Sequence, residues 1–363
     1  MGKKYDKVFL GTVFFLLLFG FFALSSASLG LAAQSDKNSY SPIIKQIALG
    51  GGVGLILFLL TSKLHYKKWR SISLPLFLFS FFITLLVFEP HLGFEHGGAR
   101  RWLALGNFTF QPAELLKFSF IVYLCSWLAK NQRTITSFKV GLIPFLVMLG
   151  LVGIILVLQP DIGTLGVIGI TAVFLFFISG GKFSQLGLIL LLSLILCAGL
   201  LLTKSYLWSR VEVFLDDSFD TQGAGYQLNQ AKIALGSGGV WGQGFGKGLS
   251  KFNYLPEPTG DSIFAVIGEE FGFMGTTILI ILFLLFFYKC LHIALCAPDI
   301  FGRLLASGIG ILIIVQSFIN MYAIVGLIPL TGLPLIFISQ GGSALALTMA
   351  EVGILLNISK YKT

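Results

Sequence analysis

Carboxylates near residue 261 are the side chains in this sequence best suited to acid–base chemistry. Glu257 and Asp261 lie in the polar stretch YLPEPTGDS, and Glu269 and Glu270 follow within the next apolar run. Carboxylates at the start of a membrane helix are costly unless they serve a purpose. An aspartate can accept the proton of an attacking hydroxyl or hold a divalent cation such as Mg²⁺ or Mn²⁺. We therefore take this group of carboxylates as the most informative one, with Asp261 just before the apolar run, close to the aqueous boundary, and Glu257 beside it as a candidate cavity residue.

A second group of polar residues, the motif QPAELLK, opens another apolar run. Pro112 suits the first turn of a helix, and Glu114 and Lys117 are three residues apart, so both side chains leave one helix face. Charges at membrane depth usually pair with each other or line a cavity. Two interpretations stay open: a structural intramembrane ion pair, or a polar cavity near the outer surface that also includes Gln111.

Two further motifs place polar residues at the ends of apolar runs. In QPDIGT, Asp161 can cap a helix N-terminus or, with Gln159, frame a site at the outer membrane face. GGARRWL contains two guanidiniums and an indole, Arg100, Arg101 and Trp102. These side chains can anchor the chain at the membrane interface or bind the phosphates of a pyrophosphate-linked lipid. Both alternatives stay open for each motif.

Several other kinds of site are excluded. The glycine-rich stretch 236–246 has no preceding strand and no Lys-Ser/Thr ending, so it is not a nucleotide loop. Lys251, which follows it, is kept as a candidate for the substrate cavity. The four cysteines form no CxxC pair and the four histidines lack metal-ligand spacing, so we expect neither disulfides nor a zinc site. In so apolar a chain the net charge of +9 indicates membrane orientation, and no nucleic-acid partner is expected.

The elements that must position these residues are membrane helices. Hydrophobic residues make up 56% of the chain and charged residues only 11%, with a mean hydropathy of +0.90. A soluble surface needs more charge than this. We predict an all-α polytopic membrane protein, one domain over 1–363, with about ten transmembrane helices. Their expected ranges are 8–32, 43–61, 72–90, 112–129, 138–158, 161–179, 184–203, 262–288, 303–325 and 340–358.

Basic residues predict the orientation, because short cytoplasmic loops carry an excess of Lys and Arg. Both termini are therefore expected in the cytoplasm. The first apolar run is longer than the core of a cleaved signal peptide, so it is expected to remain as the first helix. The stretch 204–261 becomes a large extracytoplasmic loop between helices seven and eight, with short helices of its own, one near 227–235. The basic residues that then fall on the cytoplasmic side are Lys3, Lys4, Lys7, Lys63, Lys67, Lys68, Arg70, Lys130, Arg133, Lys139, Lys182, Lys289, Arg303, Lys360 and Lys362.

Six motifs in one order resemble the SEDS family, which includes FtsW, RodA and SpoVE. They are GGARRWL, QPAELLK, QPDIGT, ALGSGGVWGQGFGKG, KFNYLPEPTGD with IFAVIGEEFGFMG, and GLIPLTGLPLIFISQGGS. The resemblance runs from about Arg100 to Ser343, and Ser343 joins the candidate cavity residues. It implies a peptidoglycan glycosyltransferase that polymerises lipid II outside the bacterial cytoplasmic membrane and releases undecaprenyl diphosphate. By motif position, it implies that Asp261 is the essential carboxylate.

The resemblance also implies a role and partners. Glu114, Lys117 and Asp161 match polar residues of the family. The Arg100–Trp102 and Lys251–Tyr254 patterns are more similar to FtsW than to RodA, so we expect action at the division septum. RodA-type elongation and SpoVE-type sporulation are the alternatives. The implied partners are a class B penicillin-binding protein, other divisome proteins and membrane lipids.

The hypothesis for the chemistry is attack by an acceptor's 4-hydroxyl on the anomeric carbon of a lipid-pyrophosphate donor. Asp261 acts as the general base or holds a divalent cation to that end, and no other cofactor is expected. Arg100, Arg101 and Lys117 are the candidates for stabilising the departing pyrophosphate. Two rival functions are a lipid II flippase, which uses the polar cavity without chemistry, and a scaffold that only recruits the penicillin-binding protein.

Overall fold

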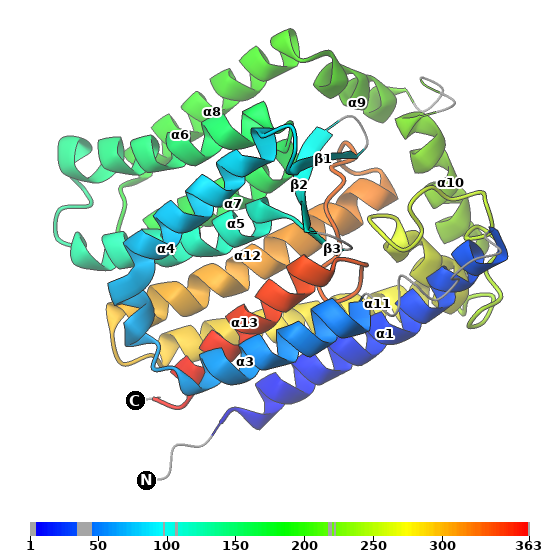
Figure 1. The fold of residues 1–363 in the computed structure, drawn as a ribbon, viewed down its shortest axis with the longest axis horizontal. Coiled ribbons are helices and arrows are strands. Elements are labelled where there is room, and N and C mark those ends of the chain that lie inside the picture. Colours follow the sequence, from blue (N-terminus) through cyan, green and yellow to red (C-terminus); the bar gives the residue numbers. More distant parts are fainter. Residues whose placement is uncertain are drawn as a thin grey trace.

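The computed structural model describes residues 5–34, 46–96, 99–105, 108–216, 220 and 223–361. Three of the basic residues used above (Lys3, Lys4 and Lys362), the two glycines of GGARRWL and the first three residues of the helix expected at 43–61 lie outside the described residues. The described chain folds into a bundle of long helices with a small sheet toward one end (Figure 1).

Helices account for most of the elements. In chain order they are α1 (Lys7–Gln34), η1 (Gln46–Val53), α3 (Gly54–Lys63), α4 (Lys67–Leu85), η2 (Leu86–Phe88), α5 (Pro112–Lys130), η3 (Phe138–Leu142), α6 (Ile143–Leu158), α7 (Ile162–Ile178), α8 (Phe183–Thr203), α9 (Ser205–Leu215), α10 (Ala224–Ser237), α11 (Ile263–Leu295), α12 (Ile300–Val325) and α13 (Gly342–Ser359). The strands are β1 (Gly93–His96), β2 (Ala99–Leu105) and β3 (Phe108–Phe110).

The predicted polytopic helical fold is confirmed. Eight helices are long and apolar enough to cross a membrane, and two shorter apolar helices, Gly50–Lys63 and Ile162–Ile178, complete the set within the described residues. Most bounds agree closely, but α4 begins at Lys67 rather than near 72, and α11 continues to Leu295 rather than ending near 288. A short helix, α10, occupies the part of the large loop where one was expected near 227–235.

The two ends of the bundle differ. α1 begins and α13 ends at the same end, whereas α9, α10 and the sheet lie toward the opposite end (Figure 1). This arrangement agrees with the expected topology, in which the termini share one side and the large loop lies on the other. α12 and α13 are mostly buried at the centre of the bundle. By contrast, only 6% of the apolar stretch of α8 is buried, and the rest of this helix faces outward.

The outer segment 91–111 forms a structure that the all-α prediction did not include. β1, β2 and β3 pair antiparallel in that order, with Phe94 opposite Trp102 and Leu103 opposite Phe110. The β1–β2 register shifts at this point, because Phe94 pairs with Trp102 and Glu95 with Arg100, which leaves Arg101 as an extra residue on β2. Such a β-bulge re-aims side chains locally.

An irregular segment, 326–341, returns into the bundle between α12 and α13. It starts at Gly326, which ends α12 in the left-handed conformation (φ 82°), and the side chains from Leu335 to Ile338 are at most 5% exposed. Irregular backbone at membrane depth requires polar partners from neighbouring protein. Gln316 and Asn320 of α12 supply them, because their side chains donate to the carbonyl oxygens of Pro334 and Leu333 at 3.2 and 2.7 Å.

Candidate functional site

Asp261 lies two residues before α11 and is half-buried. Its Oδ1 accepts a hydrogen bond at 3.1 Å from Nε2 of Gln227, on α10. Burial, followed by the charge of Glu257, raises the pKa of Asp261 to about 6, while hydrogen bonds from Gln227 and Ser262 act in the opposite direction. At neutral pH the carboxylate is therefore mostly ionised and is a stronger proton acceptor than an ordinary aspartate.

The backbone around Asp261 is held from several directions. The Asp261 carbonyl oxygen accepts from Nδ2 of Asn320 at 2.8 Å, and the Gly260 carbonyl oxygen accepts from Oγ of Ser339 at 2.6 Å. Glu257 is exposed, has φ 48°, and accepts the Gly260 N–H at 3.0 Å with its own carbonyl oxygen. α12 and the 326–341 segment therefore fix the position of the carboxylate.

The turn at Gly332 connects Asp261 to α7 and α9. Gly332 has φ 69°, and a Cβ placed there would lie 4.0 Å from Oδ2 of Asp261. One residue earlier, the carbonyl oxygen of Thr331 accepts from Nη1 of Arg210, on α9, at 3.4 Å. The same oxygen lies 3.2 Å from the position of a Cβ on Gly163, in the first turn of α7. Three separate elements therefore meet at this turn.

Asp161 caps α7, as one of the two interpretations proposed. Its Oδ1 accepts from the Thr164 N–H at 3.3 Å. Its Oδ2 and the Oε1 of Gln159 are buried without a hydrogen-bond partner among the described residues. Arg101 reaches the same turn from β2, where Nε donates to the Gln159 carbonyl oxygen at 3.3 Å and Nη2 donates to that of Pro160. Arg101, Gln159 and Asp161 therefore belong to one polar site.

α9 adds two residues to which the sequence analysis assigned no role, Tyr206 and Arg210. The Tyr206 hydroxyl is buried without a hydrogen-bond partner in the described structure; burial raises its pKa, while the charges of Arg101 and Arg210 lower it. Burial and then Arg101 lower the pKa of Arg210, whereas Asp261 and Asp161 raise it. Arg101, Tyr206, Asp161 and Asp261 therefore all lie within electrostatic range of Arg210, and these five side chains are called the Asp261 cluster. The sequence signal that could have found Tyr206 and Arg210 is their spacing of four, which puts both on one face of a helix.

Arg100 is not part of this cluster. It pairs with Glu95 of β1 at 3.2 Å, with the two side chains 49% and 55% exposed. Trp102 is half-buried opposite Phe94 on the neighbouring strand. Of the two predicted guanidiniums, the structure brings only Arg101 to the site.

The Glu114–Lys117 pair forms as predicted. Nζ of Lys117 lies 2.8 Å from Oε2 of Glu114, with the side chains 5% and 3% exposed, and it also donates to Oε1 of Gln316 at 2.5 Å. A second buried carboxylate, Glu351 on α13, lies within electrostatic range of both charges. The ammonium is enclosed by protein partners, which favours the structural interpretation of the pair. Glu351 is not among the residues predicted from the sequence.

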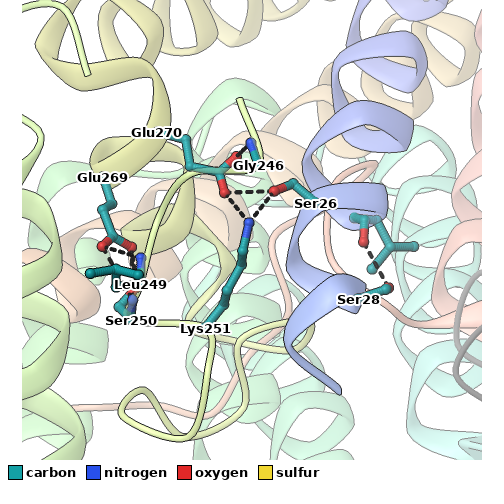
Figure 2. Close-up of polar contacts among 9 residues, drawn as sticks. Ser26, Ser28, Gly246, Leu249, Ser250, Lys251, Glu269 and Glu270 are labelled. Carbon is teal, nitrogen blue, oxygen red and sulfur yellow. Dashed lines mark hydrogen bonds and ion pairs between the residues drawn. The ribbon is translucent and has the colours of Figure 1, made fainter. Parts of the chain in front are cut away.

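Lys251 forms a buried ion pair with Glu270 of α11 and a hydrogen bond with Ser26 of α1 (Figure 2). Its side chain is 0% exposed, and Nζ lies 2.5 Å from Oε1 of Glu270 and 2.8 Å from Oγ of Ser26. The neighbouring Glu269 accepts the Ser250 N–H at 3.2 Å. Both carboxylates bind the glycine-rich loop, which indicates a structural task rather than contact with substrate.

The remaining predicted residues lie at helix starts. Gln111 is half-buried at the N-cap of α5, and Ser343 is half-buried in the first turn of α13. Within the described residues, no group of three or more His, Cys, Asp and Glu side chains is placed to hold a metal ion. A divalent cation on Asp261 stays a prediction that the structure does not test.

Comparisons with known proteins extend over almost the whole chain. It is 38% identical over 360 residues to a Geobacter protein (strain M18) named "Probable peptidoglycan glycosyltransferase FtsW", covering 98% of this chain and 97% of that one. It is 37% identical over 346 residues to stage V sporulation protein E of Bacillus subtilis, covering 95% and 94%.

Solved structures show the same fold. A chain from a peptidoglycan synthase complex, described as coordinating polymerization and crosslinking, aligns with a TM-score of 0.79 at 26% identity, covering 99% of this chain and 98% of that one. The rod shape determining protein RodA of Thermus thermophilus aligns with a TM-score of 0.71 at 27% identity, covering 99% and 97%. A family model described as a cell cycle protein, and named for FtsW, RodA and SpoVE, matches residues 6–363. The chain therefore belongs to the FtsW/RodA/SpoVE family.

Proposed function

We propose that this protein is a peptidoglycan glycosyltransferase that polymerises lipid II at the outer face of the bacterial cytoplasmic membrane. The observation that carries the proposal is the half-buried carboxylate of Asp261, which shares the Gly332 turn with the guanidinium of Arg210. Transfer of a sugar from a lipid diphosphate needs a base and positive charge close together. Relatives named as peptidoglycan glycosyltransferases support the same reaction.

In the chemical step, the Asp261 carboxylate and the guanidiniums of Arg101 and Arg210 have different tasks. The acceptor's 4-hydroxyl oxygen attacks the anomeric carbon of the donor, and the bond from that carbon to the diphosphate oxygen breaks. The electron pair leaves with the diphosphate, and the hydroxyl proton passes to the Asp261 carboxylate, whose pKa of about 6 leaves it ionised at neutral pH. Arg101 and Arg210 offset the negative charge that develops on the leaving group.

The cellular role and the partner are also part of the proposal. The motif similarity favours septal synthesis by a division-type enzyme, with elongation and sporulation as alternatives. Sporulation is kept because relatives named FtsW and stage V sporulation protein E are about equally similar to this chain. A class B penicillin-binding protein is the proposed partner. This is supported by a structural neighbour from a complex that coordinates polymerization and crosslinking.

A lipid II flippase is the second candidate, and one observation favours it. Glu351 lies buried near the middle of α13, so the polar residues extend inward from the outer rim. The two functions separate when the purified chain, with and without its penicillin-binding protein, is incubated with labelled lipid II in vesicles. We expect a ladder of glycan polymers. Movement of intact lipid II across the vesicle membrane without a ladder would instead establish the flippase. If neither polymer nor movement were seen, the remaining function would be a scaffold that only recruits the penicillin-binding protein.

A further inference from the structure

Two arginines from different elements, Arg210 on α9 and Arg101 on β2, approach the same polar site from different sides. We propose that Arg210, assisted by Arg101, is the residue that binds the diphosphate of the lipid-linked donor and of the released carrier. The inference rests on the proposed glycosyltransferase function and names the diphosphate-binding part of that site. Arg210 thus takes the place of Arg100 and Lys117, the other cations that the sequence suggested for binding the diphosphate.

Arg210 is anchored in a way that leaves much of its guanidinium available. Nη1 donates to the carbonyl oxygens of Leu330 and Thr331 at 3.0 and 3.4 Å. A guanidinium carries five N–H donors in a planar fork, and the remaining ones have no partner among the described residues. A planar fork held by one corner is preorganised for bidentate contact with phosphate oxygens.

The anchor also fixes where this guanidinium lies relative to Asp261. Arg210 is bonded to Thr331, and the next residue, Gly332, faces Oδ2 of Asp261, 4.0 Å from where its Cβ would be. The phosphates leave from the anomeric carbon that the acceptor attacks. A diphosphate-binding group must therefore lie close to the general base without neutralising it. Arg210 meets this requirement, because no ion pair joins it to Asp261 in the described structure.

Unpartnered polar atoms nearby fit the rest of a glycosyl diphosphate. Oδ2 of Asp161, Oε1 of Gln159 and the hydroxyl of Tyr206 are buried without hydrogen-bond partners among the described residues. The side chains of Asp161 and Gln159 are only 3% and 1% exposed. Buried acceptors without donors are unfavourable. Sugar hydroxyls and an N-acetyl N–H supply donors, while the adjacent guanidiniums suit the phosphates.

Charge in the cluster also favours an anionic ligand. Arg101 and Arg210 disfavour each other's charge, since Arg101 lowers the pKa of Arg210 in addition to burial. A diphosphate between them would relieve this repulsion. The other two candidate cations are already neutralised, because Lys117 is enclosed by Glu114 and Gln316 and Arg100 pairs with Glu95.

The test compares binding of two lipids that differ by one phosphate, a polyprenyl diphosphate and the monophosphate with the same chain, to the full chain in nanodiscs. Arg210→Gln should weaken diphosphate binding by roughly tenfold to a hundredfold and monophosphate binding much less. Arg210→Lys, which keeps the charge but loses the planar fork, should give an intermediate loss. Lys204→Gln removes an exposed positive charge beside α9 and should change neither affinity.

Kinetics with lipid II give the second measurement. Arg210→Gln should both raise KM and lower kcat, because it removes a group that binds the diphosphate and offsets the charge developing on it. Asp261→Asn should lose kcat and keep diphosphate binding. Unchanged diphosphate affinity in Arg210→Gln would overturn the inference, and so would equal loss of both lipids, which indicates that Arg210 only supports the Thr331 turn. A wild-type chain that binds the diphosphate selectively but makes no glycan would contradict the proposed function and leave the binding site in place.

Discussion

Asp261 and Lys117 are both withdrawn from solvent, but their partners differ. Oδ1 of Asp261 has the amide of Gln227 at 3.1 Å, and Oδ2 faces the Gly332 turn. Lys117 is held between a carboxylate at 2.8 Å and an amide oxygen at 2.5 Å. Asp261 can therefore exchange a proton with a substrate, because its surroundings favour neither protonation state strongly. The Lys117 ammonium is instead already bonded to Glu114 and Gln316.

The first prediction concerns pH. Because the pKa of Asp261 is raised to about 6, the general base is ionised above that pH and protonated below it. The rate of lipid II polymerisation should fall about tenfold per pH unit below 6 and be level between 7 and 8. The measurement is a pH profile of initial rates with purified protein. A rate that stays constant down to pH 5 would exclude Asp261 as the base.

The second prediction concerns the intramembrane pair. Glu114→Ala leaves the Lys117 ammonium buried without its carboxylate, which should destabilise the protein by about 3–5 kcal/mol and lower activity as well. Thermal unfolding in detergent measures the change. The matched control is the double variant Glu114→Gln with Lys117→Met, which removes both charges and should recover much of the loss. Equal stability of Glu114→Ala and the wild-type protein would show that the ion pair does not contribute to stability.

Single residues were predicted from the sequence where a local pattern existed. Asp161 followed from its place between two apolar runs, and the Glu114–Lys117 pair from a spacing of three. Arg210 and Tyr206 were missed because their partners, Thr331 and the Asp161 turn, are distant in sequence. For the same reason the pairing of Lys251 with Glu270, which depends on the path of the glycine-rich loop, could not be anticipated.

At the scale of elements, the glycine-rich loop and α11 form one unit. Gly272 breaks α11 with φ 64° and ψ −163°, and the loop donates the N–H groups of Gln243 and Gly244 to the carbonyl oxygens of Glu269 and Glu270 at 2.9 and 3.0 Å. The Lys251–Glu270 pair then fixes the loop against Ser26 of α1 (Figure 2). This unit therefore holds the glycine-rich loop against both α11 and α1.

The third prediction tests this unit. Lys251→Met leaves the Glu270 carboxylate buried without its cation, so stability should fall by about 3–5 kcal/mol. Adding Glu270→Gln should restore much of it, because no isolated charge then remains. Unfolding in detergent and binding of the polyprenyl diphosphate are measured together. If Lys251→Met lost ligand affinity while stability stayed unchanged, Lys251 would be a substrate residue, as the sequence analysis expected.

Elements were predicted unevenly for a physical reason. Ten apolar runs are long enough to be recognised as spans, because the bilayer sets their length. The 91–111 sheet has only three short strands, and the alternation within ARRWLAL is brief enough to be read as an interfacial loop. The re-entrant 326–341 segment is apolar and contains two prolines, and its polar partners, Gln316 and Asn320, lie on another element, so its path could not be read from its own sequence.

For the molecule as a whole, polymerisation of lipid II on the outer face requires the Asp261 site to face the outside of the cell. The fourth prediction uses cysteine labelling in a variant whose four native cysteines are serine. Tyr254→Cys, at a side chain that is 59% exposed in the large loop, should react with a membrane-impermeant maleimide in intact cells. Lys63→Cys, exposed at the end of α3, should react only after permeabilisation. The reverse pattern would invert the topology and remove the site from lipid II on the outer face.

The most direct measurement is polymerisation by Asp261→Asn, assayed with the cognate penicillin-binding protein and labelled lipid II. The variant keeps the shape of the side chain and most of its hydrogen bonds, so folding, complex formation and polyprenyl diphosphate binding should match wild type. Loss of the base should lower the rate by roughly a hundredfold to ten-thousandfold, leaving no visible ladder. A ladder of wild-type length and rate from this variant would contradict the proposed mechanism.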